Sequence, residues 1–126
     1  MKKNPIYLDL RNIKFTINAI ISILHRISGF IIFISTSIIL YVLKLSLSSP
    51  KNFTIIKMLL NKPITKYIFL SILITLIYHI LSGMRHILMD FGFIKETLKI
   101  GKITASIVFI LTIIISICIF IKKYYI

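Results

Sequence analysis

Three long stretches without a formal charge predict an all-α integral membrane protein, a bundle of three transmembrane helices. Residues 27–43, 67–84 and 103–121 contain no Asp, Glu, Lys or Arg. Each stretch is close to the roughly 17–25 residues that a membrane-spanning helix needs. The chain of 126 residues is also 58% hydrophobic, which leaves too few polar side chains to cover a soluble protein of this length.

The chain is expected to form a single membrane-anchor domain over residues 1–126. Its spans are predicted at about 16–44, 65–89 and 103–122. The first two extend past their uncharged runs, so each carries ionisable residues near one end. The connection between these two spans is polar and is expected to hold a short amphipathic turn near residues 55–60.

Basic residues that flank the spans predict the orientation, because Lys and Arg are enriched on the cytoplasmic side of membrane proteins. Nine of them lie on the side of the N-terminus and of the connection between the second and third spans, and seven lie on the opposite side. This bias predicts a cytoplasmic N-terminus. The end of the second span then lies at the same membrane surface as the start of the first.

The formal charge of +13 comes from 16 basic and 3 acidic residues. Lys greatly outnumbers Arg, and Ile dominates the apolar residues, which is typical of an AT-rich genome, so most of this excess is interpreted as compositional. The basic residues lie between apolar runs and not on one folded face, which argues against nucleic-acid binding. They suit the anionic headgroups of a lipid bilayer.

Cys118 is the only cysteine, and it lies inside an apolar run. One thiol cannot hold an iron–sulfur cluster or form an internal disulfide. Any flavin or iron–sulfur chemistry is therefore expected to belong to other chains.

Ionisable residues inside the second span form one stripe. At about 100° per residue, His79, Gly83, His86 and Asp90 project within about 60° of one another. His79 is the deepest of them, and it is interpreted either as an axial ligand of a b-type haem or as a histidine bonded to a neighbouring helix. Gly83 leaves room for a flat macrocycle or for a neighbouring helix. Arg85 projects off this stripe, where its long side chain could extend to the membrane surface.

A second polar face lies at the start of the first span, near the same membrane surface as His86. Ser22, His25, Arg26 and Gly29 project to one side of the predicted helix. A hydroxyl and a guanidinium are able to bind a quinone carbonyl or a haem propionate. The alternative is an arginine that extends to the surface beside a serine that contacts a partner, and spacing alone does not separate the two.

Two motifs in these spans resemble the signatures of the cytochrome b subunit of succinate dehydrogenase. The stretch from Ser22 to Gly29 is similar to S-x-x-H-R-x-S/T-G, and the stretch from His79 to Gly92 is similar to H-x-x-x-G-x-R-H-x-x-x-D-x-G. The resemblance covers nearly the whole chain. The family often has Arg before the N-terminal proline, where this chain has Asn4, but this departure lies outside both motifs.

The resemblance implies a role for each matched residue. His79 matches the axial ligand of the haem iron, Ser22 and Arg26 match ubiquinone-site residues, and His25 and Arg26 match positions near the haem propionates. His86 matches the second motif without an equally definite role. The resemblance further implies haem b shared with a second small membrane subunit, a flavoprotein and an iron–sulfur subunit docked on the cytoplasmic face, and a location in the bacterial inner membrane.

Two other functions remain open from the sequence. Within the same class, a fumarate reductase anchor would run the reaction in the opposite direction, which depends on potentials that this chain does not encode. From another class, a haem-free membrane scaffold or transporter subunit would use the histidine stripe only to bind protein or ions. A basic membrane-lytic protein would fit the charge but would not explain His79, His86 and Asp90 on one stripe.

Overall fold

The computed structural model describes residues 17–95 and 97–125. Within these residues the chain forms helices and no strands, which confirms the predicted fold class. Along the chain the helices are α1 (Ile17–Ser46), α2 (Pro50–Leu60), α3 (Pro63–Asp90) and α4 (Leu98–Tyr125). The basic residues before Ile17 that entered the predicted orientation lie outside the described residues.

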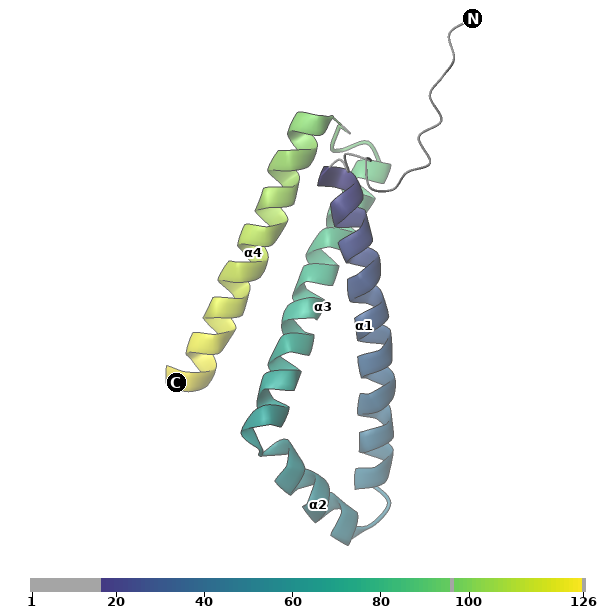
Figure 1. The fold of residues 1–126 in the computed structure, drawn as a ribbon, viewed down its shortest axis with the longest axis vertical. Coiled ribbons are helices and arrows are strands. Elements are labelled where there is room, and N and C mark those ends of the chain that lie inside the picture. Colours follow the sequence, from purple (N-terminus) through teal and green to yellow (C-terminus); the bar gives the residue numbers. More distant parts are fainter. Residues whose placement is uncertain (1–16, 96, 126) are drawn as a thin grey trace, which may run out of the picture.

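The three long helices lie along one another, and the short α2 closes one end (Figure 1). α3 runs antiparallel to α1, and α4 runs parallel to α1 (Figure 1). The starts of α1 and α4 therefore meet the end of α3 at the end of the bundle away from α2. Each long helix is apolar and long enough to cross a membrane.

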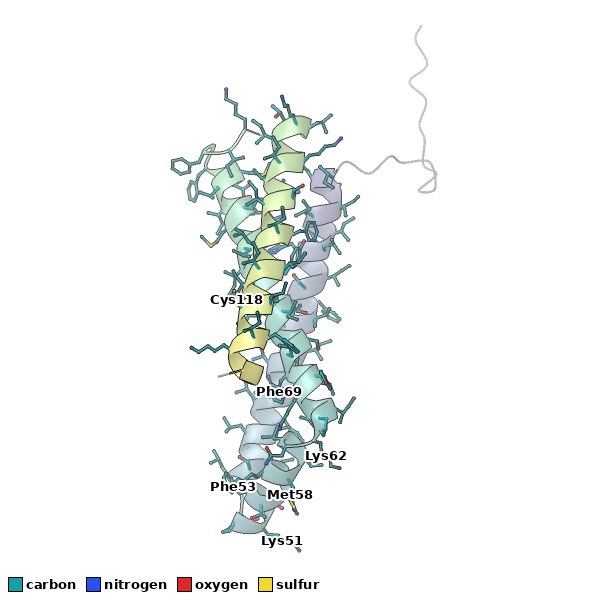
Figure 2. The ribbon with its side chains drawn as sticks, turned by 90° about the vertical axis from the view of Figure 1, so that its left-hand side faces the viewer. Lys51, Phe53, Met58, Lys62, Phe69 and Cys118 are labelled. Carbon is teal, nitrogen blue, oxygen red and sulfur yellow. The ribbon has the colours of Figure 1, made fainter. Side chains whose placement is uncertain are left out.

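Few apolar side chains are buried by the chain itself. Among the described residues, those shielded from solvent are Ile21, Met89, Ala105 and Val108. Most of the other large apolar side chains are exposed along the helices, and Cys118 is also exposed (Figure 2). A bilayer or other chains must therefore cover most of this surface, because exposed apolar area of this extent is not stable in water.

The predicted turn near residues 55–60 is too short, because α2 begins at Pro50 and forms an 11-residue helix that ends at Leu60. Ser49 caps its start by accepting a hydrogen bond from the backbone N–H of Asn52 at 3.2 Å. Pro50 follows at the first helical position, where a missing N–H costs no hydrogen bond. Figure 2 shows Lys51 and Lys62 at this end of the bundle.

α4 begins at Leu98, earlier than the predicted start at residue 103. The uncharged run underestimates this helix because Lys99 and Lys102 are exposed in its first turns, where a charged side chain reaches solvent. The preceding helix α3 ends at Asp90, and the chain turns at Gly92, whose φ of 76° lies in the left-handed region that glycine adopts without strain. The backbone N–H of Gly92 donates to the carbonyl of Met89 at 2.9 Å.

The cap of α2 can be tested by proteolysis. Replacing Ser49 by Ala removes the acceptor for the Asn52 N–H, which should destabilise the start of the helix by about 0.5–2 kcal/mol. Trypsin needs a locally unfolded chain, so cleavage after Lys51 should become about 2- to 30-fold faster in membranes. Ser46→Ala, which removes a hydroxyl bonded to the carbonyl of Leu43 at the end of α1, is the control. An unchanged cleavage rate in Ser49→Ala would contradict the capping role.

Candidate functional site

A reciprocal histidine–glycine contact joins α1 and α3 near the end where α4 begins. The ring of His25 on α1 stacks on the ring of His79 on α3, with centroids 4.2 Å apart and planes within 6°. Each histidine lies over a glycine of the opposite helix. A Cβ added at Gly83 would lie 3.1 Å from Cε1 of His25, and one added at Gly29 would lie 3.0 Å from Cε1 of His79. The two glycines therefore provide the space in which the two rings meet.

This contact accounts for the glycine at position 83. The sequence suggested that Gly83 leaves room either for a flat macrocycle or for a neighbouring helix, and in the structure the space holds the ring of His25 from the neighbouring helix α1. The same spacing of four residues occurs in both helices, from His25 to Gly29 and from His79 to Gly83. Because the helices are antiparallel, this repeated spacing places each ring opposite the other helix's glycine.

The ring of His79 is held at its Nδ1 atom. This nitrogen lies 2.9 Å from the Ser28 hydroxyl oxygen and 3.2 Å from the backbone carbonyl oxygen of His25. The Ser28 hydroxyl itself donates to that same carbonyl at 2.7 Å. A carbonyl oxygen only accepts, so the consistent assignment is that Nδ1 carries the proton and donates to both oxygens.

This hydrogen bonding determines the chemistry available to His79. With the proton on Nδ1, the lone pair of a neutral imidazole is on Nε2, the arrangement in which proteins present histidine to a metal ion. The described residues contain no cluster of three or more His, Cys, Asp or Glu that could hold a metal ion alone. A metal ion bound at Nε2 of His79 would therefore need further ligands beyond the His, Cys, Asp and Glu side chains of the described residues.

His86 and His25 have unmet hydrogen-bonding capacity. The ring of His86 lies 5.3 Å from that of His25 at an angle of 50°. Nε2 of His86 and Nδ1 of His25 are both buried, and neither has a hydrogen-bond partner among the residues that the structure describes. A buried polar atom without a partner costs about 1–3 kcal/mol, so these rings favour the approach of a group that brings a hydrogen-bonding atom.

The structure places the other predicted site residues at the edge of this cluster. Ser22 is partly exposed and Arg26 is exposed, one turn apart on α1 and within one turn of His25. Asp90 is exposed at the end of α3. The structure thus brings together His25, His79 and His86 directly, whereas Ser22 and Arg26 remain open to a ligand or a partner chain.

The roles of two residues near the site were not predicted from the sequence. Ser28 is buried and holds His79, although the only signal was its place in the first motif. Arg85 is buried, with 3% of its surface exposed, so the expected extension to the membrane surface is wrong. Its side chain points between the helices and contacts Asn18 and Thr104.

The fold and the site define a class: a multi-pass helical membrane protein that presents one anchored imidazole beside two further histidines. The sequence profile described as "Succinate dehydrogenase/Fumarate reductase transmembrane subunit" matches residues 1–119. The chain belongs to this family. The resemblance identified from the two motifs is thereby confirmed.

Two curated relatives agree with this assignment. The chain is 35% identical over 111 residues to the "Succinate dehydrogenase cytochrome b556 subunit" of Coxiella burnetii, covering 87% of this chain and 88% of that protein. It is 33% identical over 105 residues to the "Succinate dehydrogenase cytochrome b560 subunit" of Chondrus crispus, covering 79% and 80%. Both relatives are subunits of an enzyme complex and both are named as cytochromes b.

The glycines under the histidines can be tested by adding one methyl group. Gly83→Ala should push the ring of His25 away from α3, and Gly29→Ala should push the ring of His79 away from α1, because an added Cβ would lie only 3.0–3.1 Å from Cε1 of the ring and the ring would have to shift. Overpacking of this kind costs about 1–3 kcal/mol. The thermal midpoint of the purified complex should therefore fall by several degrees in each variant.

Ser71→Ala is the matched control for these variants, since Ser71 is exposed on α3 and its hydroxyl donates to the carbonyl of Ile68 within the same helix. Its midpoint should not change. Gly83→Ala and Gly29→Ala variants that melt like the control would show that the rings do not need these glycines.

Proposed function

We propose that this chain is the haem b-binding membrane-anchor subunit of a succinate:quinone oxidoreductase. The observation that carries the proposal is the anchoring of His79, whose Nδ1 is held by Ser28 and by the His25 carbonyl so that Nε2 is left for a metal. The residues present fit a haem that takes one axial imidazole from this chain. The names of the two relatives, both cytochromes b of succinate dehydrogenase, support the same function.

His79 is proposed as one axial ligand of the haem iron, and a second small membrane subunit is proposed to supply the other. When bound, haem b supplies one-electron chemistry near the quinone. His25 and Arg26 are proposed to lie on the propionate side, where an imidazole N–H and a guanidinium would bind carboxylates. Nε2 of His86, which has no hydrogen-bond partner within residues 17–95 and 97–125, fits a propionate or headgroup contact at the same surface.

Ser22 and Arg26 are proposed to hold the quinone, with ubiquinone as the substrate. The Ser22 hydroxyl would donate a hydrogen bond to one carbonyl oxygen. The Arg26 guanidinium would stabilise the negative charge that develops on that oxygen as electrons arrive, because a fixed cation in a low-dielectric site is effective there. Their partial exposure at the start of α1 supports this role, since a quinone reaches the site from the bilayer.

The other subunits are proposed to carry the remaining chemistry. Succinate would be oxidised at a flavin in one partner, and electrons would pass through the iron–sulfur clusters of another. Both would dock at the membrane surface where α1 and α4 begin, which the predicted orientation places on the cytoplasmic side of a bacterial inner membrane. The single cysteine of this chain supports this division of labour.

The ligand role of His79 can be tested by replacing it with Leu. An apolar side chain cannot ligate iron, so b-type haem per flavin should fall at least about tenfold in the purified complex. The measurement is the dithionite-reduced minus oxidised spectrum. Tyr67→Leu, which replaces an exposed aromatic side chain on the same helix, is the control and should retain the haem. Full haem retention in His79→Leu would contradict the assignment.

The quinone role of Arg26 can be tested by two assays on one preparation. Arg26→Leu removes the cation that stabilises the reduced quinone, so quinone reduction by succinate should fall about 10²- to 10³-fold. Succinate oxidation with an artificial acceptor that takes electrons from the soluble subunits should change little. Equal losses in both assays would indicate failed assembly and not a defect at the quinone, whereas equal retention would exclude Arg26 from the site.

A further inference from the structure

Arg85 joins three helices at the end of the bundle that carries the histidine cluster. It is the one buried charged side chain among the described residues. Its Nε donates to the Thr104 hydroxyl on α4 at 2.9 Å, and its Nη2 donates to the Asn18 side-chain oxygen on α1 at 2.7 Å. Nη2 also lies 3.5 Å from the backbone carbonyl oxygen of Gly101 on α4.

The acceptors are arranged for this cation. The Thr104 hydroxyl donates its own proton to the carbonyl of Ile100 at 2.9 Å, so its lone pairs are left for Arg85. A Cβ built at Gly101 would collide with the side chain of Asn18. The Asn18 side chain of α1 therefore lies directly against α4 at Gly101, and the guanidinium reaches both helices from α3.

Only a guanidinium can make this connection. Its nitrogens are fixed in a plane and donate in different directions, whereas a lysine ammonium is a single point on a flexible stem. In a low-dielectric interior such charge-assisted hydrogen bonds are strong, and a cation displaced from its acceptors is costly. The three helix ends are therefore expected to hold one geometry.

This contact lies one turn from the proposed quinone site. Asn18 precedes Ser22 by four residues on the same face of α1, and Arg26 follows by four more. On α3, Arg85 directly precedes His86. A shift of α1 at Asn18 would thus displace the residues that would bind the quinone.

We propose that Arg85 is a positioning residue, which fixes the first turns of α1 and α4 against the end of α3 and thereby holds Ser22 and Arg26 in place for the quinone. The claim that Ser22 and Arg26 are held for the quinone is the second part, and it rests on the proposed function. The claim that Arg85 fixes the helix ends is the first part; it concerns only this chain and can be measured without haem or quinone.

Hydrogen–deuterium exchange of the assembled complex tests the first part. In Arg85→Met the amides in the first turns of α1 and α4 should exchange about tenfold faster, because local opening of these turns no longer carries the cost of breaking the guanidinium hydrogen bonds. Arg85→Lys should behave similarly, since one nitrogen cannot serve two helices. Lys102→Met, which removes an exposed cation from the same turn of α4, is the matched control. Unchanged exchange in both Arg85 variants would overturn the proposal.

Steady-state kinetics with a water-soluble ubiquinone analogue test the second part. Arg85→Met should raise the KM for the quinone about tenfold with a smaller change in kcat, because displaced Ser22 and Arg26 side chains weaken quinone binding first.

If this variant does not assemble, Asn18→Ala and Thr104→Val each remove one acceptor of Arg85. Each should also raise the exchange rate of the helix ends and the KM for the quinone. Faster exchange with an unchanged KM would show a purely structural residue and overturn the positioning role. A wild-type complex that does not reduce quinone would refute the proposed function, while the exchange experiment would still decide whether Arg85 holds the helices.

Discussion

The stacking of His25 on His79 across an antiparallel helix pair is the interaction on which the site depends. The two rings stack with their centroids 4.2 Å apart, and each ring also lies against the backbone of the opposite helix, where a residue without a side chain leaves space for it. Gly29 and Gly83 provide this space reciprocally. The backbone carbonyl of His25 then becomes part of the support for His79, so one helix provides both the neighbour and the anchor of the imidazole on the other.

The sequence predicts most of the fold because a helix that spans a bilayer needs a long run of uncharged residues, and such runs are easily recognised. Runs without charge located all three long helices, and the errors occur where lysines are tolerated near the surface, as at the start of α4. α2 was underestimated because it is too short and too polar to register as a span, although Ser49 and Pro50 are a recognisable start signal. Periodicity correctly placed His79, Gly83 and His86 on one face of α3.

Contacts between helices were harder to predict from sequence. The stripe on α3 and the polar face on α1 were both visible, but no rule of spacing pairs a particular residue of one helix with a residue of another. Asn18 and Thr104 are ordinary residues in their own helices and matter only because Arg85 reaches both. Arg85 itself was assigned to the surface because the general tendency of long cations in membranes is to extend outward, and that tendency is overridden where acceptors are available inside.

The small number of buried apolar side chains has a consequence for the cell. Of the residues that the structure describes, only a few apolar ones such as Ile21 and Ala105 are kept from their surroundings, so this part of the chain gains little from folding in isolation. Its stability is linked by mass action to whatever covers the rest of its surface. Copies made in excess of their neighbours would stay partly open and become targets for membrane proteases, so the amount of this chain would follow the supply of the others without any dedicated regulator.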